Sequence, residues 1–349
     1  MAAQVVSDSA ALHCLVEVLL ARADLGKLRR LHPLAGGANN RLFLAEGTGG
    51  QALLKVYFRH PADPRDRLRA EGAFLRFAWG HGIRAVPRPL ADDPEGGAAL
   101  YEFIPGRPLT PTEVDLDAVA QAMTFYRELN CWRDTPEAQA LPDASEACFS
   151  LEDHLGCVDR RVRGLLYVEP ESPAHQEAAR FADRELIPIW AEVQERVRHA
   201  ADRLGFTVST PILPGDRRIS PSDFGFHNCL RTAAGTLRFI DFEYAGWDDP
   251  AKLICDFFCQ PAVPVPPACY ARFASFVLED QLQPEQARQR ADLLLPVYRM
   301  KWCCILLNEF LPISRDRRRF ASDGSLATDR LAVQLDKARR ALRAVRGVE

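Results

Sequence analysis

The sequence lacks the patterns that mark a disulfide-rich or zinc-binding module. Its ten cysteines are scattered along 349 residues without a CxxC pair or a repeated spacing of cysteine and histidine. Disulfide frameworks and zinc sites depend on such regular spacing. We therefore expect reduced thiols in a cytoplasmic protein.

A targeting segment and a membrane-spanning segment are also missing from the pattern. Asp8, His13 and Glu17 interrupt the apolar residues near the N-terminus, which suits an amphipathic helix and not a signal peptide. No uninterrupted apolar run approaches the ~18 residues that a transmembrane helix needs. We therefore expect no membrane partner.

The chain has no excess of basic charge. Lysine and arginine total 44 against 47 aspartates and glutamates, for a formal net charge of −3. Nucleic-acid-binding proteins usually carry a basic surplus, so we expect no nucleic-acid partner. Lysine itself is rare, because arginine supplies almost all of the basic charge. A lysine inside an apolar strand is therefore a candidate for a specific role.

What the chain does contain is typical of a folded protein. Hydrophobic residues make up 47% and charged residues 26% of the sequence, which excludes a disordered or fibrous chain. At ~150 residues per domain, the length corresponds to about two domains. The pattern contains no internal repeat, and it leaves the oligomeric state open.

Residues 1–104 read as a β-rich unit with a leading helix. Apolar spacing predicts a helix over 9–31, and the turn residues Gly36 and Gly37 separate it from antiparallel strands. A second helix is expected to start with Asp63 as its cap and Pro64 in its first turn, and to stop at Gly80. The expected strands cover 42–44, 52–57 and 98–104.

Residues 109–349 read as mainly helical, after a hinge at 105–108. The expected helices cover 112–131, 149–166, 173–204 and most of the chain from 251 onwards. Loops and short strands interrupt the helical pattern between 215 and 250. The whole pattern predicts an α+β fold with a small β-rich lobe and a larger helical lobe.

The most informative segment runs from Ile219 to Glu243. Asp223 and Asn228 lie five residues apart on a loop rich in serine, proline and glycine, which can turn both side chains to one place. Two short strands, joined by a turn at 232–235, follow this loop. The midpoint of 228 and 241 falls in that turn, so we expect Asn228 and Asp241 to lie opposite each other at the open end of a hairpin.

A carboxylate beside an amide oxygen offers hard oxygen ligands, which suit Mg²⁺ held together with substrate phosphates. Asn228 and Asp241 are therefore candidate metal ligands, and Asp223 is placed to accept a proton from a nucleophile near the metal. The order Asp-x-x-x-x-Asn, hairpin, Asp matches the catalytic pattern of kinase-type phosphoryl transfer. A set of unrelated turn residues is the alternative for the Asp223 and Asn228 pair alone.

Lys55 extends this pattern into the first lobe. It lies in an apolar strand, sixteen residues before Glu71 on the following helix, which is the arrangement that orients ATP phosphates in a kinase. Backbone amides near Gly36 and Gly37 are candidates for covering those phosphates, with a plain hairpin turn as the alternative. Backbone groups of the segment from Glu102 to Ile104 are candidates for binding adenine.

The runs at 221–230 and 239–250 resemble the aminoglycoside phosphotransferase and choline kinase family. The resemblance extends loosely through Lys55 and Glu71 to the hinge, and only the stretch 220–256 is specific. It implies a bilobal protein-kinase-like fold and ATP-dependent phosphorylation of a small-molecule hydroxyl. In this family Asp223 corresponds to the catalytic base, Asn228 and Asp241 to the Mg²⁺ ligands, and Lys55, steadied by Glu71, to the contact with the α- and β-phosphates.

Three departures from the family pattern are visible. Pro221 and Ser222 replace the usual His-Gly before the catalytic aspartate, and the phosphate loop lacks the usual glycine pattern. Asp256 lies six residues after Pro250 where the family has an aspartate three residues after the proline, and we expect Asp256 still to brace the catalytic loop.

Two other functions remain open on the sequence. A pseudokinase would bind nucleotide and regulate other proteins without turnover. A metal-dependent hydrolase would use a set of carboxylates, namely Asp241, Glu243, Asp248 and Asp249. The acceptor of a kinase reaction also stays open between a sugar, an aminoglycoside-like compound and an amino alcohol.

Overall fold

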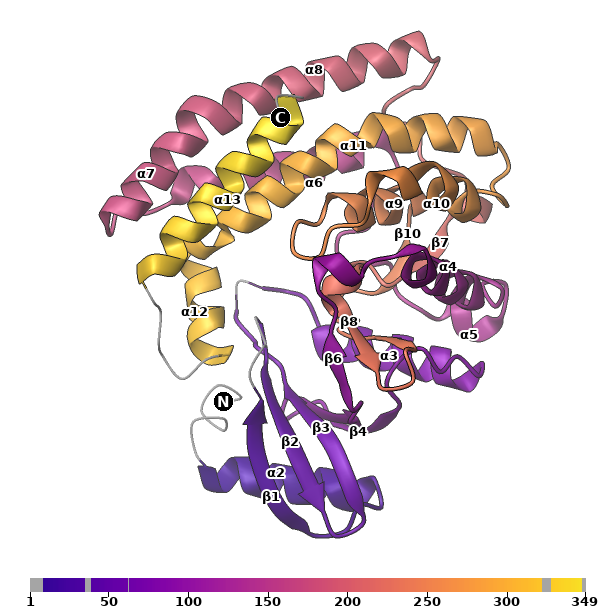
Figure 1. Cartoon of the computed structure of the whole chain (residues 1–349), viewed down its shortest axis with the longest axis vertical. Helices are drawn as coiled ribbons and strands as arrows, with labels where there is room; N and C mark the ends of the chain where they lie inside the picture. The colour runs from indigo at the N-terminus through magenta and orange to yellow at the C-terminus, as the bar shows by residue number, and fades with distance from the viewer. Residues whose placement is uncertain (1–8, 35–38, 62, 322–327, 347–349) are drawn as a thin grey trace.

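A computed structural model describes residues 9–34, 39–61, 63–321 and 328–346 of the chain. An antiparallel sheet lies at one end of the molecule and most of the helices lie at the other (Figure 1). The helices are α2 (Ser9–Arg22), α3 (Arg67–Gly80), α4 (Leu116–Asn130), α5 (Pro136–Gln139), α6 (Leu151–Gly164), α7 (Pro173–Phe181), α8 (Ile187–Arg203), α9 (Pro250–Cys259), α10 (Tyr270–Val277), α11 (Pro284–Leu307), α12 (Pro312–Ala321) and α13 (Thr328–Arg346). The strands are β1 (Leu28–Leu34), β2 (Arg41–Gly47), β3 (Gly50–Val56), β4 (Pro89–Asp93), β5 (Ala98–Glu102), β6 (Gly106–Pro108), β7 (Arg218–Ser220), β8 (Cys229–Thr232), β9 (Leu237–Phe239) and β10 (Gly246–Asp248).

The larger sheet has the strand order β1-β2-β3-β5-β4 and separates two hydrophobic clusters. Leu54 and Val56 of β3 belong to the cluster that α2 covers. Successive side chains of a strand point to opposite faces, so Lys55 lies on the other face. Tyr57 on that face belongs to the cluster that includes residues of α3. The alternation in β3 therefore places Lys55 on the same side of the sheet as α3 and Glu71.

Two predicted boundaries in this region were wrong. The leading helix ends at Arg22, not near residue 31, because Asp24 and Gly26 turn the chain with positive φ values of 55° and 71°. Residues 28–34 form the edge strand β1, whose less exposed leucines recur every three residues and therefore imitate a helical pattern. Helix α3 begins at Arg67 with Asp66 as its cap, because the Asp63 carboxylate instead binds the side chains of Arg65 and Arg67.

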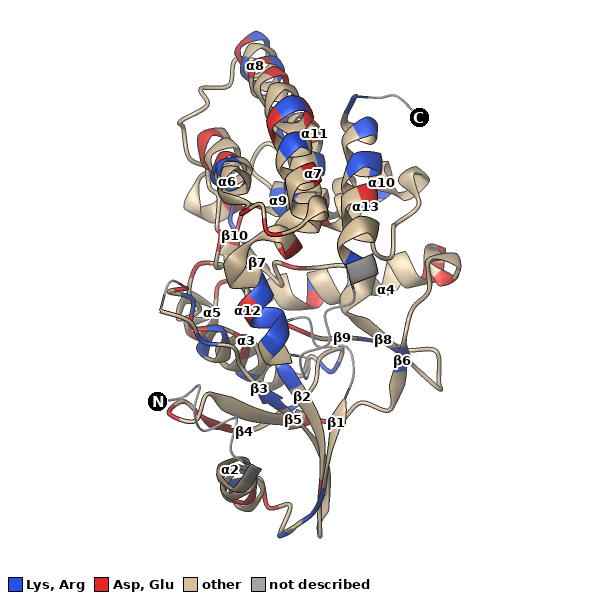
Figure 2. Ribbon diagram, turned by 90° about the vertical axis from the view of Figure 1, so that its left-hand side faces the viewer, with Lys and Arg blue, Asp and Glu red and all other residues tan. Residues whose placement is uncertain are grey.

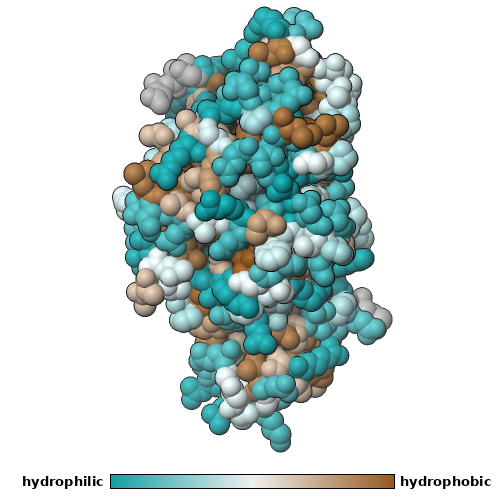
Figure 3. Space-filling view, turned by 90° about the vertical axis from the view of Figure 1, so that its right-hand side faces the viewer, coloured by the Kyte–Doolittle hydropathy of each residue, from teal (hydrophilic) through white to brown (hydrophobic). Residues whose placement is uncertain are grey.

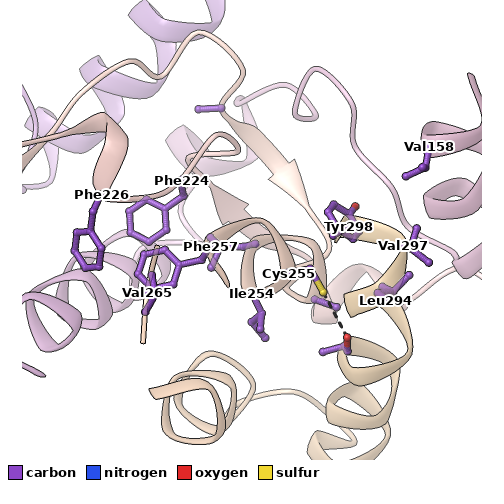
Figure 4. Packing of buried hydrophobic residues seen from close by; sticks show 14 of the residues in the cluster. Val158, Phe224, Phe226, Ile254, Cys255, Phe257, Val265, Leu294, Val297 and Tyr298 are labelled. Atoms are coloured by element: carbon purple, nitrogen blue, oxygen red, sulfur yellow. Dashed lines mark hydrogen bonds between the residues drawn. The ribbon is translucent and has the colours of Figure 1, made fainter. Parts of the chain in front are cut away.

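Helices build the rest of the chain around α11. This long helix contacts α6, α8, α9 and α13, and its buried residues join one continuous hydrophobic cluster. Figure 4 shows part of this cluster, where Leu294, Val297 and Tyr298 of α11 lie close to Ile254 and Cys255 of α9. Short strands occur between 218 and 248, as the sequence predicts. The α+β class and the helical character of this part are therefore confirmed.

Helix α12 returns from the helical part to the sheet. The ring of Phe320 packs edge-on against Phe58, with 5.6 Å between the centroids, and the Arg317 guanidinium lies 5.6 Å from the centre of the same ring. Figure 2 shows the row of basic residues on this helix next to the strands. The C-terminal part of the chain thus contacts the N-terminal sheet directly.

On the face shown in Figure 3, hydrophobic residues form small, separate groups among hydrophilic ones. None of the helices within the described ranges combines the length and the apolar character needed to cross a bilayer.

The pair Asp248 and Asp249, which precedes α9, anchors the junction between the short strands and the helices. Asp249 is fully buried, caps α9 through the Ala251 amide at 2.8 Å, and contacts His154 and Arg290 at 3.2 and 3.1 Å. Although burial opposes ionisation, the charge of Arg290 and the His154 hydrogen bond lower the pKa of Asp249 from 3.8 to about 2.

We expect Asp249→Asn to lower the free energy of unfolding by about 2 kcal/mol at pH 7. A carboxyl whose pKa is depressed in the folded state contributes stability above its unfolded pKa, and that contribution disappears as the pH falls from about 4 towards 2. Urea unfolding at pH 7 and pH 3 measures this difference, with Asp202→Asn at an exposed position of α8 as the control. An equal loss at both pH values would contradict a contribution from charge.

Candidate active site

The loop that contains Asp223 is anchored by its phenylalanines. Phe224 stacks on Phe257 of α9 with 5.2 Å between the ring centroids, and Phe226 contacts the same ring at 5.3 Å. Figure 4 shows both side chains beside Phe257. These rings are buried, whereas Asp223 and His227 on either side of them stay partly exposed.

Each oxygen of the Asp223 carboxylate has a side-chain partner. His227 Nε2 lies 3.2 Å from Oδ1, and Asn228 Nδ2 lies 3.2 Å from Oδ2. The same Asn228 amide donates to the backbone carbonyl of Asp223 at 2.9 Å. Although burial opposes ionisation, the hydrogen bond and charge of His227 hold the pKa of Asp223 below its usual range. The site therefore contains an ionised carboxylate at neutral pH.

The predicted hairpin exists, but its register differs by one residue. Cys229 pairs with Phe239, so Asn228 lies opposite Ile240, whose amide donates to the Asn228 carbonyl at 3.0 Å. The reason is that the hairpin loop has three residues. The Thr232 amide closes it by donating to the Thr236 carbonyl, and Gly235 inside it has a φ of 83°. Asp241 therefore follows the paired segment, and its own φ is 69°.

Lys55 joins the two parts of the chain. Its Nζ lies 2.6 Å from Glu71 Oε2 and 2.5 Å from Asp241 Oδ1. Glu71 also accepts from the Tyr57 hydroxyl at 2.7 Å and from the Phe242 amide at 3.2 Å. Lys55 and Glu71 are almost completely buried, while 34% of the Asp241 side chain is exposed. The structure thus brings together three of the residues that the sequence singles out.

Burial and the neighbouring charges shift the pKa values of Asp241 and Lys55. Burial raises the pKa of Asp241, and the nearby charges of Glu243 and Glu71 add to this effect, although Lys55 opposes it. Burial also disfavours the charged form of Lys55, but the three surrounding carboxylates raise its pKa well above the ordinary value. Lys55 is consequently held as a cation among acidic groups.

Glu243 is a member of this cluster that the sequence reasoning did not connect with Lys55. It is fully buried, and its carboxylate accepts from Asn40 Nδ2 at 2.6 Å and from Asn39 Nδ2 at 3.1 Å. Lys55 Nζ lies 3.8 Å from the same carboxylate. The signal in the sequence is its position two residues after Asp241, which is the spacing of side chains that share one side of an extended segment.

The remaining candidates for nucleotide contacts are two glycines, Gly36 and Gly37, and the segment from Glu102 to Ile104. Gly36 and Gly37 lie outside the described residues. The Glu102 carboxylate accepts from Arg238 at 2.7 Å and from the Arg88 amide at 3.0 Å. Within the described ranges, no backbone hydrogen bond engages Ile104, which is buried.

In the described part of the chain, the Asp256 side chain does not hydrogen-bond to the Asp223 loop, in contrast to the expected brace. Its carboxylate accepts from Lys301 Nζ at 2.7 Å and from Trp302 Nε1 at 3.0 Å. The Trp302 ring meets the His227 ring edge to face, with 5.8 Å between the centroids. Asp256 therefore reaches the loop through Trp302, because its position further along α9 directs it towards α11.

The carboxylates of the hydrolase hypothesis have other partners. Asp248 binds Lys252 Nζ at 2.6 Å, and Asp249 is occupied as described above. In the part of the chain that the structure describes, no group of three or more histidine, cysteine, aspartate or glutamate side chains is arranged to hold a metal ion. It is the engagement of Asp248 with Lys252, and of Asp249 with Ala251 and Arg290, that does not favour the hydrolase hypothesis.

Comparison with protein-family models decides the family. The model of the phosphotransferase enzyme family matches residues 30–259, which include the sheet, the Asp223 loop and α9. The chain belongs to this family. None of the curated protein sequences matches this phosphotransferase.

Solved structures of kinases share the fold of this phosphotransferase at low sequence identity. Choline kinase from Cryptosporidium parvum Iowa II is 13% identical, with a TM-score of 0.54 and 98% of each chain covered. The gentamicin complex of APH(2")-IIa is 15% identical, with a TM-score of 0.59 and coverage of 96% of this chain and 95% of that chain. Spectinomycin phosphotransferase with ADP and spectinomycin is 11% identical, with a TM-score of 0.59 and coverage of 95% and 98%. The predicted family and the protein-kinase-like fold are confirmed.

Proposed function

We propose that this phosphotransferase transfers the γ-phosphate of ATP to a hydroxyl group of a small molecule. The observation that carries the proposal is that Lys55 of the sheet meets Glu71 of α3 at 2.6 Å and Asp241 at 2.5 Å. A cation held in this way next to Asp241 is what a kinase needs to position triphosphate and metal.

In this proposal the nucleotide binds between a lobe of residues 1–104 and a lobe of residues 109–349, joined by the hinge at 105–108. Lys55 contacts the α- and β-phosphates, and Glu71 keeps its ammonium group in place. The backbone of the segment from Glu102 to Ile104 binds adenine. Gly36 and Gly37 supply backbone amides over the phosphates. Asn39 and Asn40, which follow them in the sequence, donate hydrogen bonds to the Glu243 carboxylate.

Asn228 and Asp241 fit a magnesium ion. The Asn228 amide nitrogen is committed to Asp223, which leaves the amide oxygen as a donor for the metal. Asp241 adds a partly exposed carboxylate, and Mg²⁺ commonly uses one or two such protein ligands together with substrate phosphates. When bound, the ion would neutralise charge on the phosphates.

Asp223 orients the acceptor hydroxyl and accepts its proton. Its carboxylate is ionised, partly exposed and in hydrogen-bond contact with His227 and Asn228. A pre-oriented base next to the phosphate donor supplies the positioning on which phosphoryl transfer mainly depends. A pseudokinase has no use for this base together with two metal ligands, so the geometry supports an enzyme.

The acceptor is a hydroxyl compound of the sugar, aminoglycoside-like or amino-alcohol type. The similar structures named above are a choline kinase, a gentamicin complex and a spectinomycin complex, so their fold is compatible with the amino-alcohol and aminoglycoside types. The charges around Asp223 do not select a polycation, because Lys301 and His227 offset Asp256 and Asp223.

The test is transfer of label from γ-labelled ATP, with Mg²⁺, into a deproteinised bacterial metabolite extract. We expect a labelled product that is absent when the protein is omitted, and its identification would name the acceptor. A protein that binds MgATP tightly but labels no compound in extracts of several bacteria would favour the pseudokinase instead.

A further inference from the structure

His227 occupies a place for which the sequence offers no explanation. Pro221 and Ser222 precede Asp223, and His227 follows it by four residues with its imidazole against the Asp223 carboxylate. We propose that His227 is a positioning residue that fixes the rotation of the Asp223 carboxylate. The catalytic consequence rests on the proposed function, whereas the effect on the carboxylate can be measured without turnover.

His227 contacts the Asp223 carboxylate, whose rotation the backbone of the loop does not restrict. Phe224 and Phe226 hold the backbone through Phe257, but they do not limit rotation of the carboxylate about its last side-chain bond. The rotation is restricted by His227 Nε2 at Oδ1 and by Asn228 Nδ2 at Oδ2, both at 3.2 Å. Asn228 also offers its amide oxygen to the metal in the proposed function, whereas His227 has no second role there.

The position of the imidazole is itself supported from the opposite side. Trp302 of α11 meets the ring at an interplanar angle of 85°, and its indole N–H is bound to Asp256, which also binds Lys301. These partners come from α9 and α11, which pack against each other in the main hydrophobic cluster. His227 therefore connects the side chain of Asp223 to this helix pair.

At position 225 the structure leaves no space for a side chain beside the His227 imidazole. A Cβ atom on Gly225 would lie 2.7 Å from His227 Nδ1 and 2.8 Å from Cε1, far inside van der Waals contact. Gly225 is extended, with φ at 173°, so its backbone conformation does not explain the glycine. The close approach of the His227 ring explains why this position is a glycine.

Only one nitrogen of His227 has a partner. Nε2 faces Asp223, while Nδ1 is buried without a hydrogen-bond partner in the described part of the chain. Glutamine places its amide nitrogen near the position of Nε2, whereas asparagine is too short and reaches only the position of Nδ1. The proposal therefore makes opposite predictions for these two substitutions.

The first experiment is steady-state hydrolysis of MgATP, with water as the acceptor. We expect His227→Ala and His227→Asn to lower kcat by about 10- to 100-fold, the effect of one hydrogen bond to a charged group, with KM for MgATP unchanged. His227→Gln should recover most of the loss. Gly225→Ala, which displaces the ring without removing it, should resemble His227→Ala and add little to it in the double variant. His199→Ala, at an exposed position of α8, is the control.

The second experiment is a crystal structure of His227→Ala, in which we expect the Asp223 carboxylate to be rotated from its orientation in the wild type. An unchanged carboxylate, or equal kcat values for wild type and His227→Ala, would overturn the proposal. Absence of ATP hydrolysis in the wild type would show that water does not replace the acceptor, and the crystal structures would then decide the role of His227, while label transfer decides the proposed function.

Discussion

Asp223→Asn is expected to lower phosphoryl transfer by about 100- to 10,000-fold, the range attributed to a general base. The substitution keeps the shape of the side chain and removes its negative charge. Because Lys55, Glu71 and Asp241 are unchanged, MgATP should bind with nearly the wild-type affinity. Label transfer at saturating ATP measures the first effect, and isothermal titration calorimetry measures the second.

The matched control is Asp202→Asn, which removes an exposed carboxylate at the end of α8. It should transfer label at the wild-type rate. Wild-type turnover in Asp223→Asn would show that another group accepts the hydroxyl proton. A loss of MgATP affinity equal to the loss of turnover would place Asp223 in nucleotide binding instead.

Asp241→Asn is expected to abolish the Mg²⁺-dependent part of the stabilisation by ATP. At a nucleotide concentration 100 times its dissociation constant, a ligand stabilises the folded state by about 2.7 kcal/mol. The variant loses the carboxylate that faces the metal, while Lys55 keeps its contact with Glu71. Melting temperatures with ATP, measured with and without Mg²⁺, should therefore differ in the wild type and coincide in the variant.

Asp92→Asn provides the control, because Asp92 of β4 is a partly exposed carboxylate that also pairs with a basic side chain, Arg76, at 3.2 Å. It should keep the full response to Mg²⁺. A metal response in Asp241→Asn equal to that of the wild type would remove Asp241 from the metal site. Loss of the response in both variants would point to a general effect of charge.

Sequence patterns were sufficient to predict those parts of the site whose residues lie near one another in the chain. The strand that carries Lys55 and the helix that carries Glu71 are both visible as hydrophobic periodicity, and the 2.6 Å contact follows from packing one on the other. The spacing of Asp223 and Asn228 likewise predicts a shared position, because a short loop separates them. The α+β class follows from the same periodicities.

Boundaries and register depended on details that periodicity does not contain. Leucines spaced three apart in β1 imitate a helix, and only the turn at Asp24 and Gly26 ends α2 at Arg22. The one-residue difference in the hairpin comes from a left-handed Gly235, which allows a shorter loop than the turn residues suggest. Each of these local conformations competes with an alternative of similar free energy, and tertiary contacts decide between the two.

The order of residues along the chain is enough to indicate the family, the class of fold and most of the residues around Lys55 and Asp223. The contacts of Glu243 with Asn39 and Asn40, and of His227 with Trp302, join segments that are far apart in sequence. Such contacts depend on how the sheet, α9 and α11 pack, and packing is a property of the whole chain. Only the folded structure therefore shows that Asp256 reaches the loop through Trp302 and that His227 lies against Asp223.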